Sequence, residues 1–302
     1  MSKSISIIIP FYNGESFYPN LLNSIKKAIS VCDSAKTEFE IITIIDSIET
    51  KFDIVNELFL KCFKSDVNVT SLIIKNEKNI GVAGSRNIAI LASKGNYLHI
   101  IDQDDIISEN FYSEIIFLLD NYNFVLYNGK VDYTSNKYNS HKLYYLKPDL
   151  SIKGMLKNDF IRSPGQVVFL KKLLKKNLFP EPVNYKGADD RFFWLRIFIE
   201  NLDFLKVIYV KNTGYVANIH DDNYSADSNN LKRSTLESWE IFSREINIEK
   251  YDDLVRNDIL RIKFALKEKM STYNKFKGCV LNLIYFLELN KIIRFIIKRK
   301  IW

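Results

Sequence analysis

Residues 97–105 read YLHIIDQDD, an apolar run that ends abruptly in three carboxylates. A short apolar run bounded by polar residues is typical of a buried strand, so we expect a strand over 97–101. Acids clustered at the end of a strand repel one another unless a positive group binds there. A divalent cation with oxygen ligands, which would also hold a diphosphate, meets that requirement. The alternative is that Asp104 or Asp105 caps a helix, which we expect over 106–119.

Strand-like and helix-like segments alternate on either side of this run. Further strands are expected over 4–9, 38–45, 69–74 and 124–127, and further helices over 17–31, 87–92 and 188–200. This alternation predicts an α/β fold with a mainly parallel sheet covered by helices on both faces. Ligands of such folds bind beyond the carboxyl ends of the strands, where Asn13, Asp46 and Asp102 all fall. The polar segment 132–151 is expected to be a loop.

Two other acidic or glycine-rich segments precede expected helices. Asp189 and Asp190 stand at a helix start, where they either stabilise the helix dipole or supply a general base with a raised pKa. Gly81, Gly84 and Ser85 lead into a helix whose backbone N–H groups could face an anion, or they only form a turn. Residues 163–166 contain a Pro-Gly step that lines a ligand pocket or makes a turn.

His220 stands beside two aspartates in a polar segment. A histidine in this setting is either a metal ligand or a solvated side chain. The three cysteines have no metal-like spacing, so we expect free thiols in a reducing compartment. The N-terminus runs straight into a strand-like segment, so we expect no signal peptide.

Together these motifs resemble the large family 2 glycosyltransferases in order and approximate spacing. The resemblance rests on residues 6–13, Asp46, Asn79, Gly81, Ala83, Arg86, Asn87, Asp102, Asp104, Asp105, Asp189, Asp190, Phe193, Trp194 and Arg196. It covers about residues 4–225 and implies a GT-A fold, with a Rossmann-like, mixed but mostly parallel sheet and a helical C-terminal extension. We expect a catalytic domain over 1–230 and a helical extension over 231–302.

The resemblance also implies roles for individual residues. The donor nucleotide would bind at Pro10, Tyr12, Asn13, Asp46, Arg86, Asp102 and Gln103. Mn²⁺ or Mg²⁺ on the donor diphosphate would be held by Asp104, with Asp102 and His220. Asp190 would act as the base that deprotonates an acceptor hydroxyl, so that the anomeric configuration inverts in a single displacement.

Three positions depart from the family pattern. Ser47 stands where a second nucleobase-site acid is usual, and Asp189 replaces a Glu. Ala217 and Asn218 occupy the region upstream of His220 where the family often has an Arg. Nucleobase identity and one diphosphate contact are therefore the least constrained features of the implied site.

The function implied is transfer of a hexose or N-acetylhexosamine from a nucleotide-diphosphate sugar, UDP-linked in the family's commonest donors. The acceptor would be a saccharide, carried on a lipid such as a polyprenyl diphosphate, in O-antigen, capsule or lipopolysaccharide biosynthesis. A metal-dependent phosphohydrolase is the first alternative, but it carries its Asp-x-Asp motif on the first strand. A sugar nucleotidyltransferase is the second, but it begins with a glycine-rich basic loop where this chain has Pro10 to Asn13.

The net charge of +7 lies entirely in the C-terminal quarter, where residues 231–302 hold 16 Lys and Arg against 9 Asp and Glu. No nucleic-acid recognition motif accompanies this charge, so we expect no nucleic-acid partner. Residues 279–297 are apolar but interrupted by charges, which favours an interfacial helix on anionic lipid over a membrane span. The alternative is a helix that packs back on the catalytic domain. We expect a cytoplasmic protein associated peripherally with the inner face of the membrane.

Overall fold

The computed structural model describes residues 3–33, 37–64, 69–133, 140–175, 178–180, 184–219 and 227–284. Within these ranges the strands are β1 Lys3–Phe11, β2 Thr37–Ile45, β3 Val69–Lys75, β4 Tyr97–Ile100, β5 Ile106–Ile107, β6 Phe124–Tyr133, β7 His141–Lys142, β8 Val167–Leu170 and β9 Val207–Ile219. The helices are α1 Tyr18–Ser30, α2 Phe52–Phe63, α3 Gly81–Ala92, α4 Phe111–Leu118, α5 Ile152–Asn158, α6 Asp189–Glu200, α7 Ser228–Glu245 and α8 Asp252–Ala265.

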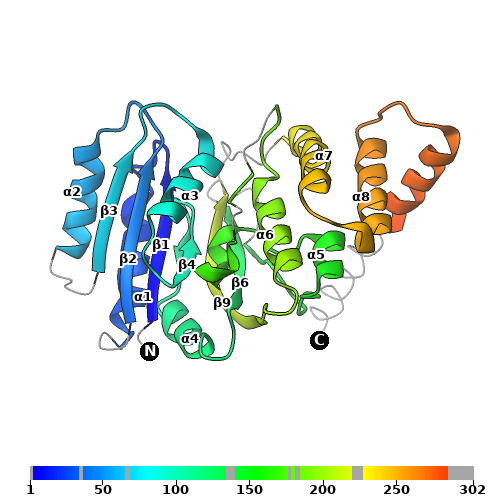
Figure 1. The fold of residues 1–302 in the computed structure, drawn as a ribbon. Helices are drawn as coiled ribbons and strands as arrows, with labels where there is room; N and C mark the ends of the chain where they lie inside the picture. Colours follow the sequence, from blue (N-terminus) through cyan, green and yellow to red (C-terminus); the bar gives the residue numbers. More distant parts are fainter. Residues whose placement is uncertain are drawn as a thin grey trace.

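The described strands form one mixed sheet in the order β3-β2-β1-β4-β8-β6-β9-β5, with β7 paired to β6. β1, β2, β3 and β4 are parallel, and β8 runs antiparallel to both β4 and β6. Helices cover both faces, as Figure 1 shows. The α/β fold with a mostly parallel sheet is therefore as the sequence predicts.

Alternate residues of the central strand β1 enter two separate apolar clusters. Ile8 packs with residues of α3, α5 and α6, whereas Ile7 and Ile9 pack with residues of α1, α2 and α4. Successive side chains of a strand point to opposite faces, so a continuous isoleucine run suits a strand buried on both sides. Asn13, Asp46 and Asp102 lie just beyond this largely apolar interior, after the carboxyl ends of β1, β2 and β4.

Several predicted boundaries are wrong. The helix expected over 106–119 is preceded by the short strand β5, because Ile106 pairs with Val216 of β9. The helix expected from Asn87 begins earlier, at Gly81, whose φ of 83° suits a glycine at a helix start. Part of the expected loop 132–151 belongs to β6, β7 and a helix start.

The C-terminal helices α7 and α8 pack directly against α6 and α5. Trp239 and Phe242 of α7 and Val255 of α8 belong to the same apolar cluster as α6. A further helical stretch, 272–284, follows α8, so the extension is helical as predicted (Figure 1). Among the described residues, no helix combines the length and apolar character that crossing a bilayer requires. The division of the chain at residue 230 stays a prediction.

Replacing Trp239 by Ala is expected to lower the free energy of unfolding by about 3–5 kcal/mol, because a large buried ring leaves a cavity. Trp239 is 0% exposed and packs edge-on against Phe192 of α6, with ring centroids 4.8 Å apart. Urea denaturation followed by circular dichroism measures the change. Phe117→Ala, at a ring that is 77% exposed, is the control and should change stability little. An equally small loss for Trp239→Ala would contradict the shared core.

Candidate active site

The carboxyl ends of β1, β2 and β4 bring the first candidate residues together. Asn13, in the left-handed region with φ of 48°, lies after β1, and its Oδ1 accepts a hydrogen bond from Ser47 after β2. Asn and Asp are the non-glycine residues that adopt this backbone region most readily. Ser47, at the position where an acid is usual in the family, therefore shapes the loop that carries Asn13.

Asp46 is buried and its carboxylate is fully engaged. It accepts hydrogen bonds from Asn76 Nδ2 at 2.8 Å, from the Ile80 backbone N–H at 2.9 Å and from the Gly81 backbone N–H at 2.8 Å. A carboxylate at this position satisfies donors that the start of α3 would otherwise leave unpaired. Asp46 thus fixes the glycine-bearing turn 79–81 beside the strand ends.

Gln103 holds the loop after β1 against the acidic turn. Its Oε1 accepts from the Tyr12 backbone N–H at 2.8 Å, and its Nε2 donates to the Tyr12 carbonyl at 2.9 Å. A Cβ at Gly14 would lie 2.2 Å from Gln103 Oε1, so a larger residue there would displace this amide from its contacts with Tyr12. The Tyr12 side chain remains 53% exposed and offers an aromatic face to a ligand. Pro10 lies buried in β1, just before this loop.

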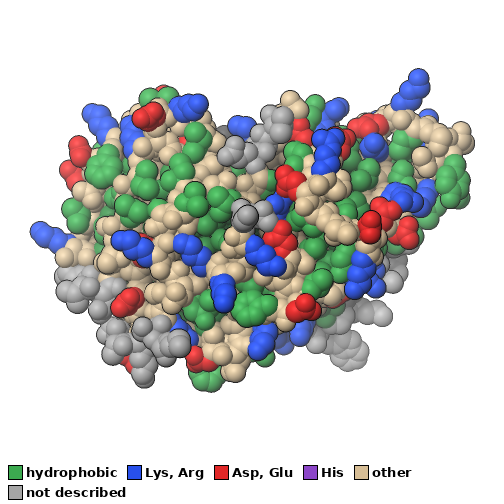
Figure 2. All heavy atoms as spheres, in the orientation of Figure 1, with side chains coloured by type: hydrophobic (Ala, Val, Ile, Leu, Met, Phe, Trp, Pro, Cys, Tyr) green, Lys and Arg blue, Asp and Glu red, His purple; other side chains and the backbone are tan. Residues whose placement is uncertain are grey.

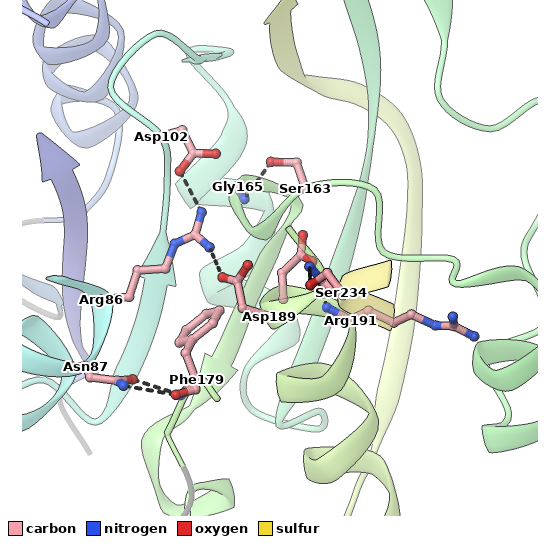
Figure 3. A network of polar contacts seen from close by, with 11 residues as sticks. Arg86, Asn87, Asp102, Ser163, Gly165, Phe179, Asp189, Arg191 and Ser234 are labelled. Carbon is pink, nitrogen blue, oxygen red and sulfur yellow. Dashed lines mark hydrogen bonds and ion pairs between the residues drawn. The ribbon is translucent and has the colours of Figure 1, made fainter. Parts of the chain in front are cut away.

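Arg86 joins the two acidic motifs across the site. Its Nη2 lies 2.8 Å from Asp102 Oδ1, and its Nη1 lies 3.2 Å from Asp189 Oδ2 (Figure 3). The guanidinium also lies over the Phe179 ring, 5.1 Å from its centroid. Burial opposes the charge of Arg86, but the neighbouring acids Asp102, Asp189 and Asp190 outweigh it and raise its pKa. The buried guanidinium of Arg86 therefore ties the acidic turn at Asp102 to the start of α6, where Asp189 lies 103 residues after Arg86.

Asp105 does not cap a helix. It is buried, with its Oδ2 accepting from the Tyr215 hydroxyl and its Oδ1 from the Asn218 backbone N–H at 3.2 Å. Burial, and then the charges of Asp102 and Asp104, raise its pKa well above the ordinary value. Asp105 therefore ties the acidic turn to β9, while Asp102 and Asp104 stay half-exposed.

The two aspartates at the start of α6 have different surroundings. Asp189 is buried and pairs with Arg86, whereas Asp190 is half-buried and its Oδ1 accepts from the Arg191 backbone N–H at 2.7 Å. Burial of its carboxyl, and then the charges of Asp189 and Asp159, raise the pKa of Asp190 to about 8 against the opposing effect of Arg86. A carboxylate with such a pKa suits proton transfer near neutral pH.

Tyr215, which the motifs did not identify, and Gln166 fix the segment 163–166 beside the acidic turn. The Tyr215 hydroxyl donates to Asp105 Oδ2 and lies 2.6 Å from Ser163 Oγ, whose hydroxyl therefore donates to it. Gln166 is fully buried, accepts from the Arg162 and Ser163 backbone N–H groups and donates to the Tyr127 carbonyl at 2.9 Å. Tyr215 lies inside a strand that the sequence pattern did not reveal, so no local signal marked it.

The oxygen donors at the strand end suit a divalent cation. Asp102 and Asp104 supply carboxylate oxygens at the strand end, and a hard cation such as Mg²⁺ needs only one or two protein carboxylates when substrate phosphates and waters complete its shell. No group of three or more His, Cys, Asp or Glu side chains that could hold a metal by itself occurs among the described residues. His220, the third predicted ligand, lies outside the described residues. The residues present fit a cation that is shared with a diphosphate.

Comparison with known proteins identifies related sequences. The *Escherichia coli* UDP-Glc:α-D-GlcNAc-diphosphoundecaprenol β-1,3-glucosyltransferase WfgD is 25% identical over 273 residues, covering 87% of this chain and 90% of its own. The *Staphylococcus aureus* poly(ribitol-phosphate) β-N-acetylglucosaminyltransferase TarS is 24% identical over 196 residues, 64% of this chain. The matched part is 32% of TarS, about a third of its length.

Solved structures share the fold. The crystal structure of TarS 1–349 in complex with UDP-GlcNAc matches with a TM-score of 0.64 and 19% identity, over 93% of this chain and 79% of that one. The mannosyltransferase PcManGT from *Pyrobaculum calidifontis*, in complex with GDP-Man and Mn²⁺, matches with a TM-score of 0.56 and 14% identity, over 94% and 74% of the two chains. These likenesses confirm the predicted fold class.

A family model described as glycosyl transferase family 2 matches residues 6–178. That range holds the strand-end site from Asn13 to Asp104 and reaches beyond half of the chain. The family predicted from the sequence motifs is therefore confirmed, and this protein belongs to glycosyl transferase family 2.

Proposed function

We propose that this protein is an inverting glycosyltransferase that moves a hexose or N-acetylhexosamine from a UDP-linked donor to a lipid-linked saccharide in surface-polysaccharide biosynthesis. The observation that carries the proposal is the unequal pair at the start of α6. Asp189 is ion-paired with Arg86, while burial and the charge of Asp189 raise the pKa of Asp190 to about 8. The site therefore combines a charged strand-end cluster for a diphosphate with one carboxyl suited to proton transfer.

The donor nucleotide would lie along the carboxyl ends of β1, β2 and β4. Tyr12 offers an exposed ring for the nucleobase of the donor. Asn13 and the turn held by Asp46 flank this ring. Pro10 and Gln103 would shape the same pocket through the loop after β1. WfgD uses UDP-Glc by its name, and TarS has been crystallised with UDP-GlcNAc, which favours UDP as the nucleotide.

Asp102, Asp104 and His220 would hold Mn²⁺ or Mg²⁺ together with the donor diphosphate. The bound cation would supply neutralisation of the charge that develops as the nucleotide leaves, an effect worth several kcal/mol. Arg86 anchors Asp102 from behind, and Asn218 Nδ2 donates to the Asp104 carbonyl at 2.6 Å. These contacts fix the acidic turn before any ligand arrives, as electrostatic preorganisation requires.

Asp190 would accept the proton of the attacking acceptor hydroxyl. The oxygen of that hydroxyl forms a bond to the anomeric carbon as the bond to the diphosphate breaks, and the nucleoside diphosphate leaves with the electron pair. Attack from the face opposite the leaving group inverts the anomeric configuration. WfgD matches over nearly its whole length and acts on a GlcNAc-diphosphoundecaprenol, which supports a lipid-diphosphate-linked saccharide as acceptor.

The interfacial helix predicted over 279–297 lies mostly outside the described residues, and we propose that the described helical stretch 272–284, which overlaps its start, rests on an anionic membrane surface. Its exposed apolar side chains recur at helical spacing and comprise Tyr273, Phe276, Val280, Leu283 and Ile284. Figure 2 shows hydrophobic side chains beside Lys and Arg over this end of the molecule. An apolar helix face flanked by basic residues suits the interface of an anionic bilayer. The location would then be the cytoplasmic face of the membrane.

The rival functions fit less well. A phosphohydrolase of the aspartyl-phosphate kind carries its Asp-x-Asp motif on its first strand, whereas Asp102 and Asp104 follow β4 here. A sugar nucleotidyltransferase has no need of a general base at the position of Asp190. The family match and the named relatives also favour a glycosyltransferase over both alternatives.

Asp190→Asn is expected to lower transfer by about 10²–10⁴-fold while leaving UDP affinity unchanged, because the change removes the base and not the donor site. The assay follows UDP release from UDP-glucose and UDP-GlcNAc with a synthetic GlcNAc-diphospholipid acceptor, and NMR of the product gives its anomeric configuration. A β-linked product from these α-linked donors indicates inversion. Asp203→Asn, at an exposed residue just beyond the other end of α6, is the matched control.

The wild-type pH profile provides a second readout of the same assignment. A base acts in its deprotonated form, and the pKa of Asp190 is about 8, so kcat/KM should rise as pH increases from about 6.5 to 9. Full activity of Asp190→Asn, or a rate that falls over this range, would contradict the role given to Asp190.

Phe276→Asp combined with Leu283→Asp is expected to abolish flotation with vesicles of phosphatidylcholine and phosphatidylglycerol, because it places charge on the apolar helix face. Wild-type flotation should weaken at high salt and with phosphatidylcholine alone, since part of the attraction is electrostatic. Phe117→Asp, at an exposed ring on α4, serves as the control. Unchanged flotation of the double variant would remove this helix from the membrane contact.

A further inference from the structure

Arg191, the residue after the proposed base, lies in α6 and its side chain contacts three other helices. Its Nη2 lies 3.0 Å from Asp258 Oδ2 of α8 and 3.2 Å from the Leu156 carbonyl of α5. Its guanidinium lies over the ring of Trp239 of α7 at 5.6 Å, and its side chain is 11% exposed. The first turn of α6 is therefore fastened to α5, α7 and α8 through one side chain, whose backbone N–H also bonds Asp190.

Asp258 is the anion on which this connection depends. It is 8% exposed and accepts from Arg191, from Trp239 Nε1 at 3.0 Å and from Arg261 Nη2 at 2.7 Å. Burial opposes its ionisation, but the two arginines and the indole N–H outweigh burial and hold the pKa of Asp258 below its ordinary value. Among the described residues, the hydrogen bonds and ion pairs of the Asp258 carboxylate therefore go to α6, to α7 and to its own helix.

We propose that Arg191 and Asp258 are positioning residues for glycosyl transfer, which hold the first turn of α6 so that the Asp190 carboxyl faces the acceptor hydroxyl. The inference rests on the proposed function, because it takes Asp190 to be the base. It gives helices α7 and α8 a part in the reaction itself. A displacement of about 1 Å at a reacting group can cost on the order of 10²-fold in rate, so a fixed first turn matters for catalysis.

A purely structural role explains the pair less well. Buried ion pairs add little net stability, since desolvation offsets their attraction. The network also lies within the electrostatic surroundings of the base. Asp190 is faced by Asp189 of α6, by Asp159 at the end of α5 and by Arg86 of α3, and Asp159 in turn is influenced by Arg191, Arg162 and Asp258. Arg191 and Asp258 therefore connect to Asp190 both through the first turn of α6 and through Asp159.

Asp258→Asn is the first test. We expect kcat to fall on the order of 10²-fold with KM for the UDP-sugar and affinity for UDP unchanged, because the donor site is untouched. Asp252→Asn, an exposed acid of the same helix that pairs with Arg256, is the matched control and should leave kcat and KM unchanged.

Arg191→Gln gives an independent test if the first variant folds poorly. It breaks the same connection from the other partner, so kcat should again fall while KM for the UDP-sugar and affinity for UDP stay unchanged. This split between kcat and KM, measured per folded molecule, distinguishes positioning of the base from a general loss of stability.

Two outcomes would overturn the proposal. In the first, both variants keep wild-type kcat per folded molecule and lose only thermal stability. In the second, both alter KM for the UDP-sugar or affinity for UDP to the same extent as kcat. Failure of the proposed function looks different, because Asp190→Asn itself would then remain active.

Discussion

The buried guanidinium of Arg86 is the constraint on which the rest of the site depends. It contacts Asp102 after β4 and Asp189 at the start of α6, which are otherwise separated by the whole central part of the chain. A single cation between two acids lets the fold place a third and a fourth carboxylate, Asp104 and Asp190, nearby without the full cost of like-charge repulsion. The turn that would meet a diphosphate and the helix that would carry the base are thereby set relative to one another.

The helices after residue 227 complete this arrangement from the other side. Trp239 and Phe242 of α7 pack on α6, and Asp258 of α8 holds Arg191, so the start of α6 is fixed between Arg86 on one side and Asp258 on the other. The basic C-terminal part therefore has two faces with different chemistry. One face is buried against α6, the helix that begins at Asp189 and Asp190. The other face, on 272–284, exposes apolar side chains.

The amino-acid pattern predicted the first four strands, the helical C-terminus and every residue now proposed for the donor site. It missed β5, β7 and β8, because strands of two to four residues carry no periodic signal. It also missed the 13-residue strand β9, whose burial does not alternate from one residue to the next. The motifs named Arg86, Asp105 and Asp190 but not their surroundings. The pairing of Arg86 with Asp189, of Asp105 with Tyr215 and of Arg191 with Asp258 depends on tertiary contacts that local spacing does not encode.

The most direct test of the account is isothermal titration of UDP, GDP and dTDP with and without Mn²⁺, using the wild type and Asp104→Ala. The strand-end cluster predicts binding of UDP that requires Mn²⁺ and is lost in the variant. The substitution Asp104→Ala removes one of the carboxylates proposed to bind the cation. Binding of GDP or dTDP instead would revise the nucleobase while keeping the site. Absence of metal-dependent binding by all three nucleotides would contradict the assignment of this cluster as the donor site.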